Sequence, residues 1–195
     1  GIADSTPLIQ ELLEKNISVI SDIEFAFRYT NAKIAAITGS NGKTTTTLLL
    51  GYILKNAGYD VLTAGNIGVS FALSISKRDY DYIVLELSSF QLDGINNFRP
   101  DIAILLNITA DHLDRYDHQL DNYKASKYRI TKNQTDQDIL IYNIDDNLVK
   151  MIQTKAKKIP ISLHKELKEG GWLTKNELLI KLNNRTMTIK ELALQ

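Results

Sequence analysis

The sequence predicts an α/β fold, with a mostly parallel sheet flanked by helices and a small β-meander near the C-terminus. Three observations favour this fold. Short runs rich in Ile, Val and Leu alternate with helix-length stretches along most of the chain. A glycine-bearing loop joins the first of these runs to the stretch that follows it. The tail from residue 172 to residue 189 has short segments separated by the turn sequences KNE and LNNRT.

The short apolar runs predict buried strands. Near-continuous apolar strands are typical of a parallel sheet that is covered on both faces. The expected strands occupy residues 33–38, 60–64, 81–87, 101–107, 138–143 and 158–163.

The stretches between the strands predict helices with recognisable ends. Gly58 suits the position just after a helix C-terminus, and Asp145 and Asp146 suit an N-cap and first turn. Two further helices are expected within residues 5–29, the first with Thr6 as N-cap and Pro7 as its first residue. The other expected helices occupy residues 44–57, 68–77, 120–132 and 145–154.

Composition bounds the class of protein. The chain has 195 residues and is 44% hydrophobic, which is enough for one sizeable core. Its 23 Lys and Arg residues balance 23 Asp and Glu residues, whereas a nucleic-acid binder would show a basic excess. The sequence has no cysteine and no apolar run near the ~20 residues that span a bilayer. It has no signal peptide, so we expect a cytoplasmic protein without nucleic-acid or membrane partners.

The loop GSNGKTT at residues 39–45 predicts a phosphate site and a sheet of the P-loop type. The usual pattern, G-x-x-x-x-G-K-[ST], would need a glycine where Ile37 stands. Even so, Gly42 lets the backbone approach an anion, and the N–H groups of residues 41–45 lie at a helix N-terminus. Lys43 supplies a cation, and the hydroxyl of Thr44 or Thr45 can bind Mg²⁺. The alternative is a loop whose threonines only cap a helix, but its place between strand and helix favours phosphate binding.

Other polar residues follow neighbouring strands of the expected sheet. Glu86 ends a buried strand, where ligands of open α/β sheets gather; the alternative is a solvent-facing edge charge. The segment NITADHLDRYDH at residues 107–118 contains His112, a candidate metal ligand, and His118, which we expect to be solvated. His164 is expected to be structural or exposed.

Two further groups leave alternatives open. Asn66, in the turn GNIG, either donates to a ligand or tolerates a left-handed backbone. Lys124, Lys127 and Arg129 lie on one expected helix. Their spacing alone favours a solvated basic face.

Together these motifs resemble the Mur ligase family, whose ATP loop has the short form G-[TS]-N-G-K-[TS]-T. The four motifs GNIG, ELSSFQL, DHLDRY and YKASKYRI are similar to the branch of the family that adds D-glutamate. The ordered resemblance covers roughly residues 30–165. It implies a cytoplasmic ligase of peptidoglycan synthesis that uses ATP to join D-glutamate to UDP-N-acetylmuramoyl-L-alanine through an acyl phosphate.

The resemblance also implies roles for individual residues. Lys43 would neutralise the phosphates within a nucleotide site made of Gly39, Ser40, Asn41, Gly42, Lys43, Thr44 and Thr45. Two Mg²⁺ ions would be held by Thr44, Glu86, His112 and a CO2-derived carbamate on Lys127. The muramoyl substrate would lie near Asn66, Ser88, Ser89 and His112. The catalytic residues would be Lys43, Glu86, His112 and Lys127.

The family enzyme has three domains, and this chain resembles the central ATPase domain alone. We expect one domain over residues 1–195, with N-terminal helices (1–30), an α/β core (31–165) and a β appendage (166–195). The UDP-binding and amino-acid-binding domains would be absent, and the expected oligomeric state is a monomer. Alternatives are a nucleotide-binding module without catalysis, a related ligase for another amino acid, and a P-loop switch protein, for which a base-reading motif such as N-K-x-D is missing.

Overall fold

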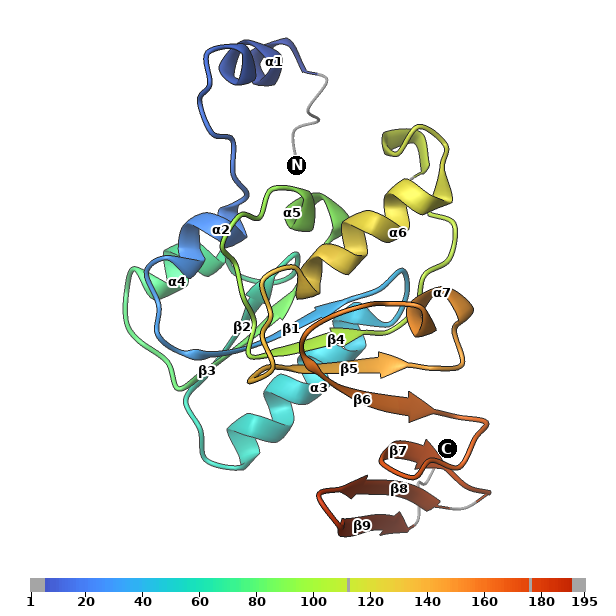
Figure 1. The fold of residues 1–195 in the computed structure, drawn as a ribbon. Helices are drawn as coiled ribbons and strands as arrows, with labels where there is room; N and C mark the ends of the chain where they lie inside the picture. The colour runs from blue at the N-terminus through green and yellow to red at the C-terminus, as the bar shows by residue number, and fades with distance from the viewer. Residues whose placement is uncertain (1–5, 112, 176, 191–195) are drawn as a thin grey trace.

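The computed structural model describes residues 6–111, 113–175 and 177–190 (Figure 1). Its centre is one nine-stranded sheet with the order β2-β3-β1-β4-β5-β6-β7-β8-β9. Pairing is parallel from β2 to β7 and antiparallel from β7 to β9. The strands are β1 (Lys33–Thr38), β2 (Val61–Gly65), β3 (Tyr82–Glu86), β4 (Ile102–Leu105), β5 (Ile139–Asn143), β6 (Lys157–Ser162), β7 (Gly170–Leu173), β8 (Glu177–Leu182) and β9 (Arg185–Lys190).

The strand predictions are confirmed, including the meander at the end of the chain. The six predicted core strands all form, with ends shifted by two residues or fewer. The meander strands β7, β8 and β9 extend the main sheet, because β7 pairs in parallel with β6.

The helices confirm most of the predicted positions and correct some lengths. They are α1 (Pro7–Glu14), α2 (Asp22–Phe27), α3 (Lys43–Asn56), α4 (Phe71–Ile75), α5 (Ser89–Asp93), α6 (Leu120–Tyr128) and α7 (Asn147–Lys150). Two short 3₁₀ helices lie on either side of α6, at Leu113–Arg115 before it and at Arg129–Thr131 directly after it.

Helices α4 and α7 are shorter than predicted, and they start later because their N-caps lie inside the expected ranges. The Ser70 hydroxyl accepts from the N–H of Leu73, so α4 starts at residue 71. Asp146 accepts from the N–H groups of residues 148 and 149, which starts α7 at Asn147. The predicted cap at Thr6 is correct in position, but its side chain makes no capping hydrogen bond.

Helix α5 was not predicted, because five residues are too few to show a helical period. The sequence nevertheless contains a signal for the start of α5. The Ser88 hydroxyl accepts from the N–H of Gln91, and the Gln91 side chain accepts from the N–H of Ser88. This reciprocal capping box is the signal that could have located the helix.

The two faces of the sheet are covered unequally. Helices α2, α4, α5 and α6 bury one face in a large core that includes Ile23, Phe71, Leu92 and Tyr123. Helix α3 packs on the other face, where Leu50 and Leu54 contact a smaller cluster of Ile37, Val61, Val84 and Ile104. Helix α1 stands away from the sheet (Figure 1). Among the described residues, every helix is too short or too polar to cross a membrane.

Candidate functional site

The strand order places the predicted site at a point where the chain changes direction in the sheet. Strand β1 lies between β3 and β4, so the chain runs from β1 to β2 and β3 on one side and then crosses to β4 on the other. Ligands of open α/β sheets bind at the carboxyl ends of strands beside such a point. The register puts Ile37 beside Glu86 and Glu86 beside Gly65, so three strand ends lie at one level.

The glycine-bearing loop is joined to the segment that follows β4. The Asn107 side chain accepts from the N–H of Asn41 at 2.8 Å and donates to its carbonyl at 3.0 Å. The Ser40 hydroxyl accepts from the N–H of Thr109 and donates to its carbonyl, both at 3.0 Å. The N–H of Asn41, which the sequence places among the anion donors, is therefore already bonded to Asn107.

Gly42 has a left-handed backbone, with φ of 82°, and stands at the N-cap of α3. Residues with a Cβ rarely adopt this conformation. Gly42 thus turns the chain so that the first N–H groups of α3 lie at the carboxyl edge of the sheet. Thr44 and Thr45 are exposed in this first turn.

Two lysines meet at one carbonyl of this loop. Lys43 Nζ donates to the carbonyls of Gly39 at 2.9 Å and Ser40 at 2.8 Å. Lys127 Nζ donates to the same Gly39 carbonyl at 2.9 Å and lies 4.5 Å from the centre of the Tyr123 ring.

Lys127 is buried, so the expectation of a solvated basic face is wrong for this residue. Its exposed fraction is 1%. Burial, together with the positive charge of Lys43, lowers the pKa of Lys127 to about 7. Helix α6 turns this lysine inward because its Tyr123, Ser126 and Lys127 face packs into the protein.

Glu86 is also buried, which excludes the solvent-facing alternative. It is 2% exposed. One carboxylate oxygen accepts from the Thr44 hydroxyl at 2.6 Å, and the other accepts from the Asn66 amide at 2.9 Å. The N–H of Asn66 also donates to the Glu86 carbonyl at 2.9 Å. Asn66 therefore orients Glu86 in this structure, a role beyond either sequence alternative.

A cavity of about 120 Å³ is lined by five of the predicted site residues, Lys43, Asn66, Ser88, Ser89 and Lys127. Helix α5 forms one wall with Ser88 and Ser89, and α6 forms another with Tyr123 and Lys127. The full lining is Lys43, Asn66, Ser88, Ser89, Phe90, Asp111, Tyr123 and Lys127.

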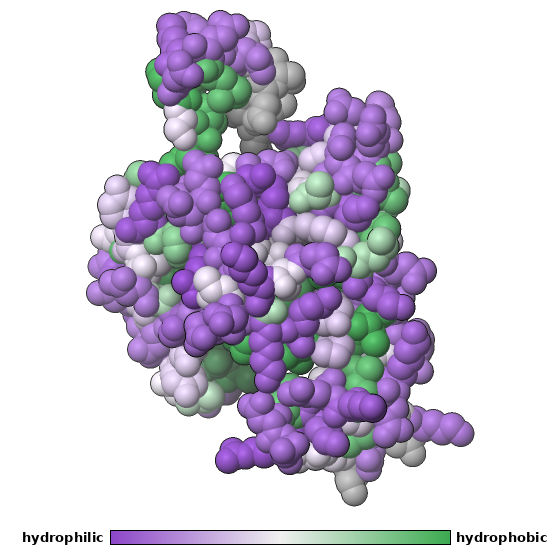
Figure 2. Space-filling model, viewed as in Figure 1, coloured by the Kyte–Doolittle hydropathy of each residue, from purple (hydrophilic) through white to green (hydrophobic). Residues whose placement is uncertain are grey.

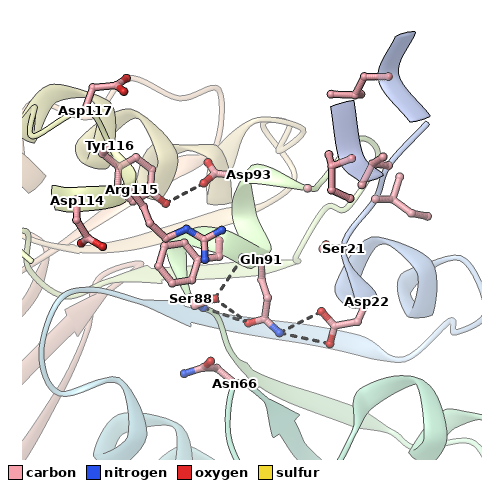
Figure 3. Close-up of a pocket in the computed structure, with 16 residues that line it drawn as sticks. Ser21, Asp22, Asn66, Ser88, Gln91, Asp93, Asp114, Arg115, Tyr116 and Asp117 are labelled. Atoms are coloured by element: carbon pink, nitrogen blue, oxygen red, sulfur yellow. Dashed lines mark hydrogen bonds between the residues drawn. The ribbon is translucent and has the colours of Figure 1, made fainter. Parts of the chain in front are cut away.

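A second cavity of about 810 Å³ adjoins it and shares Asn66, Ser88 and Phe90 (Figure 3). It opens between α5, the segment 114–117 and the chain below α1, where a hollow is visible in Figure 2. Gln91 donates to both carboxylate oxygens of Asp22 at 3.2 and 3.3 Å across this cavity.

Of the residues that line the larger cavity, only Asn66 and Ser88 were predicted as site residues; Asp22, Gln91 and Arg115 are among those that sequence reasoning missed. The Arg115 guanidinium lies 3.9 Å from the centre of the Phe90 ring. The motifs GNIG, ELSSFQL and DHLDRY each contain lining residues of this cavity, whereas Asp22 comes from α2, outside every predicted motif.

The structure describes two of the three histidines. His112 lies outside the described residues. His118 and His164 are exposed, as predicted. Within the described ranges the structure groups no three His, Cys, Asp or Glu side chains as a metal site.

The profile of the Mur ligase middle domain matches residues 37–189, which include the loop, Glu86 and Lys127.

The chain belongs to the Mur ligase family.

Relatives of this Mur ligase domain cover nearly all of the chain. The UDP-N-acetylmuramoylalanine--D-glutamate ligase of Christiangramia forsetii is 48% identical over 201 residues, covering 100% of this chain and 45% of the relative. The ligase of the same name from Bacteroides fragilis is 51% identical over 184 residues, covering 92% of this chain and 41% of the relative. The chain therefore spans less than half the length of these curated relatives.

Solved Mur ligase structures share the fold. The crystal structure of MurF ligase from Thermotoga maritima in complex with ADP has a TM-score of 0.60 at 23% identity. The match covers 86% of this chain and 42% of that one. The predicted α/β fold is thus confirmed by both the strand order and a known relative of the family.

Proposed function

We propose that this Mur ligase domain is the ATP- and Mg²⁺-binding centre of a cytoplasmic ligase of peptidoglycan synthesis. The ligase joins D-glutamate to UDP-N-acetylmuramoyl-L-alanine. The observation that carries the proposal is the convergence of Lys43, Glu86 and Lys127 at one sheet edge. Support for the substrates comes from the names of the relatives at 48% and 51% identity.

The reaction must turn a carboxylate, which is a poor electrophile, into an acyl donor. ATP transfers its γ-phosphoryl group to the alanine carboxylate, giving an acyl phosphate and ADP. The D-glutamate amine then attacks the acyl carbon, phosphate leaves, and the nitrogen loses a proton. The contribution of the protein is to align the groups and neutralise charge.

The nucleotide phosphates are proposed to lie against the loop of Gly39, Ser40, Asn41, Gly42, Lys43, Thr44 and Thr45, in which the N–H of Asn41 stays bonded to Asn107. Lys43 already lies over this loop, bonded to the Gly39 and Ser40 carbonyls. Its ammonium exchanges these neutral acceptors for the β- and γ-phosphate oxygens. Asn107 keeps the loop in shape during this exchange through its two bonds to Asn41.

The oxygen donors at this edge suit Mg²⁺, which prefers carboxylate, hydroxyl and phosphate oxygens. The Thr44 hydroxyl and Glu86 carboxylate lie 2.6 Å apart, so both can face one cation. His112 and a carbamate on Lys127 are the proposed ligands of a second ion. When bound, the ions offset the charge of the phosphates as the γ-phosphoryl group moves.

The carbamate requires a neutral amine. Lys127 Nζ loses one proton to become a neutral amine and adds to the carbon of CO2, which forms an N–C bond as one C=O π bond breaks. The nitrogen then loses a second proton to solvent, which leaves an anionic carbamate. The burial of Lys127 and the nearby Lys43 ammonium favour the neutral amine, and Lys43 then offsets the negative charge of the product.

The muramoyl substrate is proposed to reach the smaller cavity from the larger one. Asn66 and Ser88 line both cavities, and Ser89 lines the smaller one. His112 completes the proposed substrate contacts. The glutamate and uridine sites are assigned to parts of the ligase beyond this domain, and the ligase is proposed to act as a monomer.

A nucleotide titration tests the proposal. A non-hydrolysable ATP analogue with Mg²⁺ is titrated calorimetrically into the chain, into Lys43→Ala and into Lys55→Ala. Lys55 lies exposed in the last turn of the same helix and is the matched control. We expect binding that Lys43→Ala weakens at least ~10-fold, because a charge-assisted bond to phosphate contributes about 1.5–3 kcal/mol. Equal affinities for all three proteins would contradict the proposed phosphate site.

A turnover assay separates the proposed ligase from its alternatives. The longer protein that contains this domain is incubated with ATP, UDP-N-acetylmuramoyl-L-alanine and D-glutamate. Amide product excludes the module without catalysis. Product only with another amino acid would assign the protein to a different ligase of the family.

A further inference from the structure

Helix α5 forms one wall of the smaller cavity, yet it cannot be stable alone. It has five residues, and isolated helices shorter than about 12 residues are marginal in water. Its N-terminal end is satisfied by the capping box of Ser88 and Gln91. Its C-terminal end has carbonyl groups that need donors from elsewhere.

Arg129 supplies those donors. Its Nε donates to the carbonyl of Leu92 at 2.7 Å. Its Nη2 donates to the carbonyls of Asp93 at 3.0 Å and Ile95 at 2.9 Å. A planar guanidinium presents several donors in a fixed fork, so one side chain can bond three carbonyls at once.

The neighbours of Arg129 hold the other side of the same site. The Ser126 hydroxyl donates to the carbonyl of Ser89 at 2.9 Å, at the start of α5. Lys127 Nζ reaches the carbonyl of Gly39 at 2.9 Å. The single turn of chain at residues 126–129 therefore bonds both ends of α5 and also contacts the glycine-bearing loop.

We infer that Arg129 is a positioning residue that sets the distance between the Ser88–Ser89 wall and Lys127. Arg129 is half-buried and stands outside the described linings of both cavities, so it acts through α5 rather than on a substrate. The inference rests on the proposed function, because that function makes this distance matter. It predicts that loss of the guanidinium affects the substrate that contacts α5 more than the nucleotide held by the loop.

Arg99 provides a matched control. Its Nε and Nη2 bond the two carboxylate oxygens of Asp138 at 2.7 and 3.0 Å, so it is also an arginine that uses its fork, although its side chain is exposed. It precedes β4 and therefore lies at the opposite, amino edge of the strands.

The test measures steady-state kinetics of the whole ligase that contains this domain. For Arg129→Ala we expect kcat/KM for the muramoyl substrate to fall about 10- to 100-fold, the scale of a misplacement of ~1 Å. The KM for ATP should stay within about threefold, and Arg99→Ala should change neither value by more than that. Arg129→Lys should recover only part of the loss, because an ammonium lacks the fork.

Chemical rescue separates positioning from general instability. Guanidinium ion at roughly 20 mM, far below denaturing concentrations, should restore part of the activity of Arg129→Ala, whereas ammonium at the same concentration should not. Equal losses toward ATP and the muramoyl substrate, or failure of rescue in a folded variant, would overturn the inference.

A second measurement does not depend on turnover. Hydrogen exchange of the α5 amides in the same ligase should be faster in Arg129→Ala than in wild type or Arg99→Ala, with α3 unchanged. Equal exchange of the α5 amides in all three proteins would refute the positioning role of Arg129, even if the ligase is active. A wild-type ligase that makes no amide would contradict the proposed function instead. The exchange result would then still test whether Arg129 holds α5 in place.

Discussion

At the scale of single residues, burial determines the chemistry of this site. Lys127 is 1% exposed and Glu86 is 2% exposed. Lysine and glutamate are almost never buried to this extent unless another group pairs with them. Glu86 is balanced by two neutral donors, Thr44 and Asn66. Lys127 instead has one carbonyl acceptor, and its burial, together with the positive charge of Lys43, lowers its pKa.

The lowered pKa of Lys127 predicts a pH dependence of stability. Between pH 7 and pH 10.5 the unfolded chain carries a proton on Lys127 that the folded chain lacks, so the free energy of unfolding rises with pH in this window. From pH 7 to pH 9 we expect a rise of roughly 2 kcal/mol from this group. Urea unfolding in CO2-free buffer checks it.

The comparison proteins are Lys127→Met and Lys55→Met. Lys127→Met should lose this rise, whatever its absolute stability. Lys55→Met should retain it, because Lys55 is exposed. An identical rise in all three proteins would show that Lys127 titrates as an ordinary lysine.

At the scale of elements, close approach between strand ends places Glu86. Gly65 ends β2 beside Glu86 in β3, and a Cβ at Gly65 would lie 2.2 Å from the Glu86 carbonyl oxygen. Backbone cannot yield as a flexible side chain does, so only glycine fits here.

Substitution of Gly65 tests this packing. Gly65→Ala should cost more free energy of unfolding than Gly58→Ala, because both have positive φ but a Cβ at Gly58 meets no atom within 4 Å. For Gly58→Ala we expect a cost of about 1 kcal/mol, and for Gly65→Ala at least ~2 kcal/mol more. Denaturant titrations of both variants measure the two losses in free energy of unfolding. Equal losses would show that the ends of β2 and β3 can move apart to make room for a Cβ.

At the scale of the whole molecule, the β-meander is a continuation of the main sheet. Strand β7 carries Trp172, the one tryptophan of the chain, and pairs with β6 on one side and β8 on the other. Trp172 is 6% exposed, so its fluorescence reports on the junction between the core and the meander.

This junction makes the single-domain expectation for residues 1–195 testable. If the sheet unfolds as one unit, Trp172 fluorescence and far-ultraviolet circular dichroism should give the same midpoint in urea. An earlier fluorescence midpoint would show that the meander separates first and is a unit of its own.

The fold class was predictable because short, near-continuous apolar runs mark buried strands, helix-length stretches separate them, and glycine and aspartate mark helix ends. The loop at Gly42 and Lys43 was predictable because its chemistry is local. Helix α5 was missed because five residues carry no period, and the burial of Lys127 was missed because helical spacing does not tell which face packs inward.

The sequence by itself determined the order of strands along the chain, the glycine-bearing loop with Lys43 and the polar residues that follow the strand ends. Only the tertiary structure decided that Asn66 orients Glu86, that Lys43 and Lys127 share the Gly39 carbonyl, and that Arg129 holds α5. The physical reason is distance along the chain. Except for the bond between Lys43 and Gly39, these contacts join residues 20 to 88 positions apart in the sequence. Such residues meet only when the strands and helices pack together.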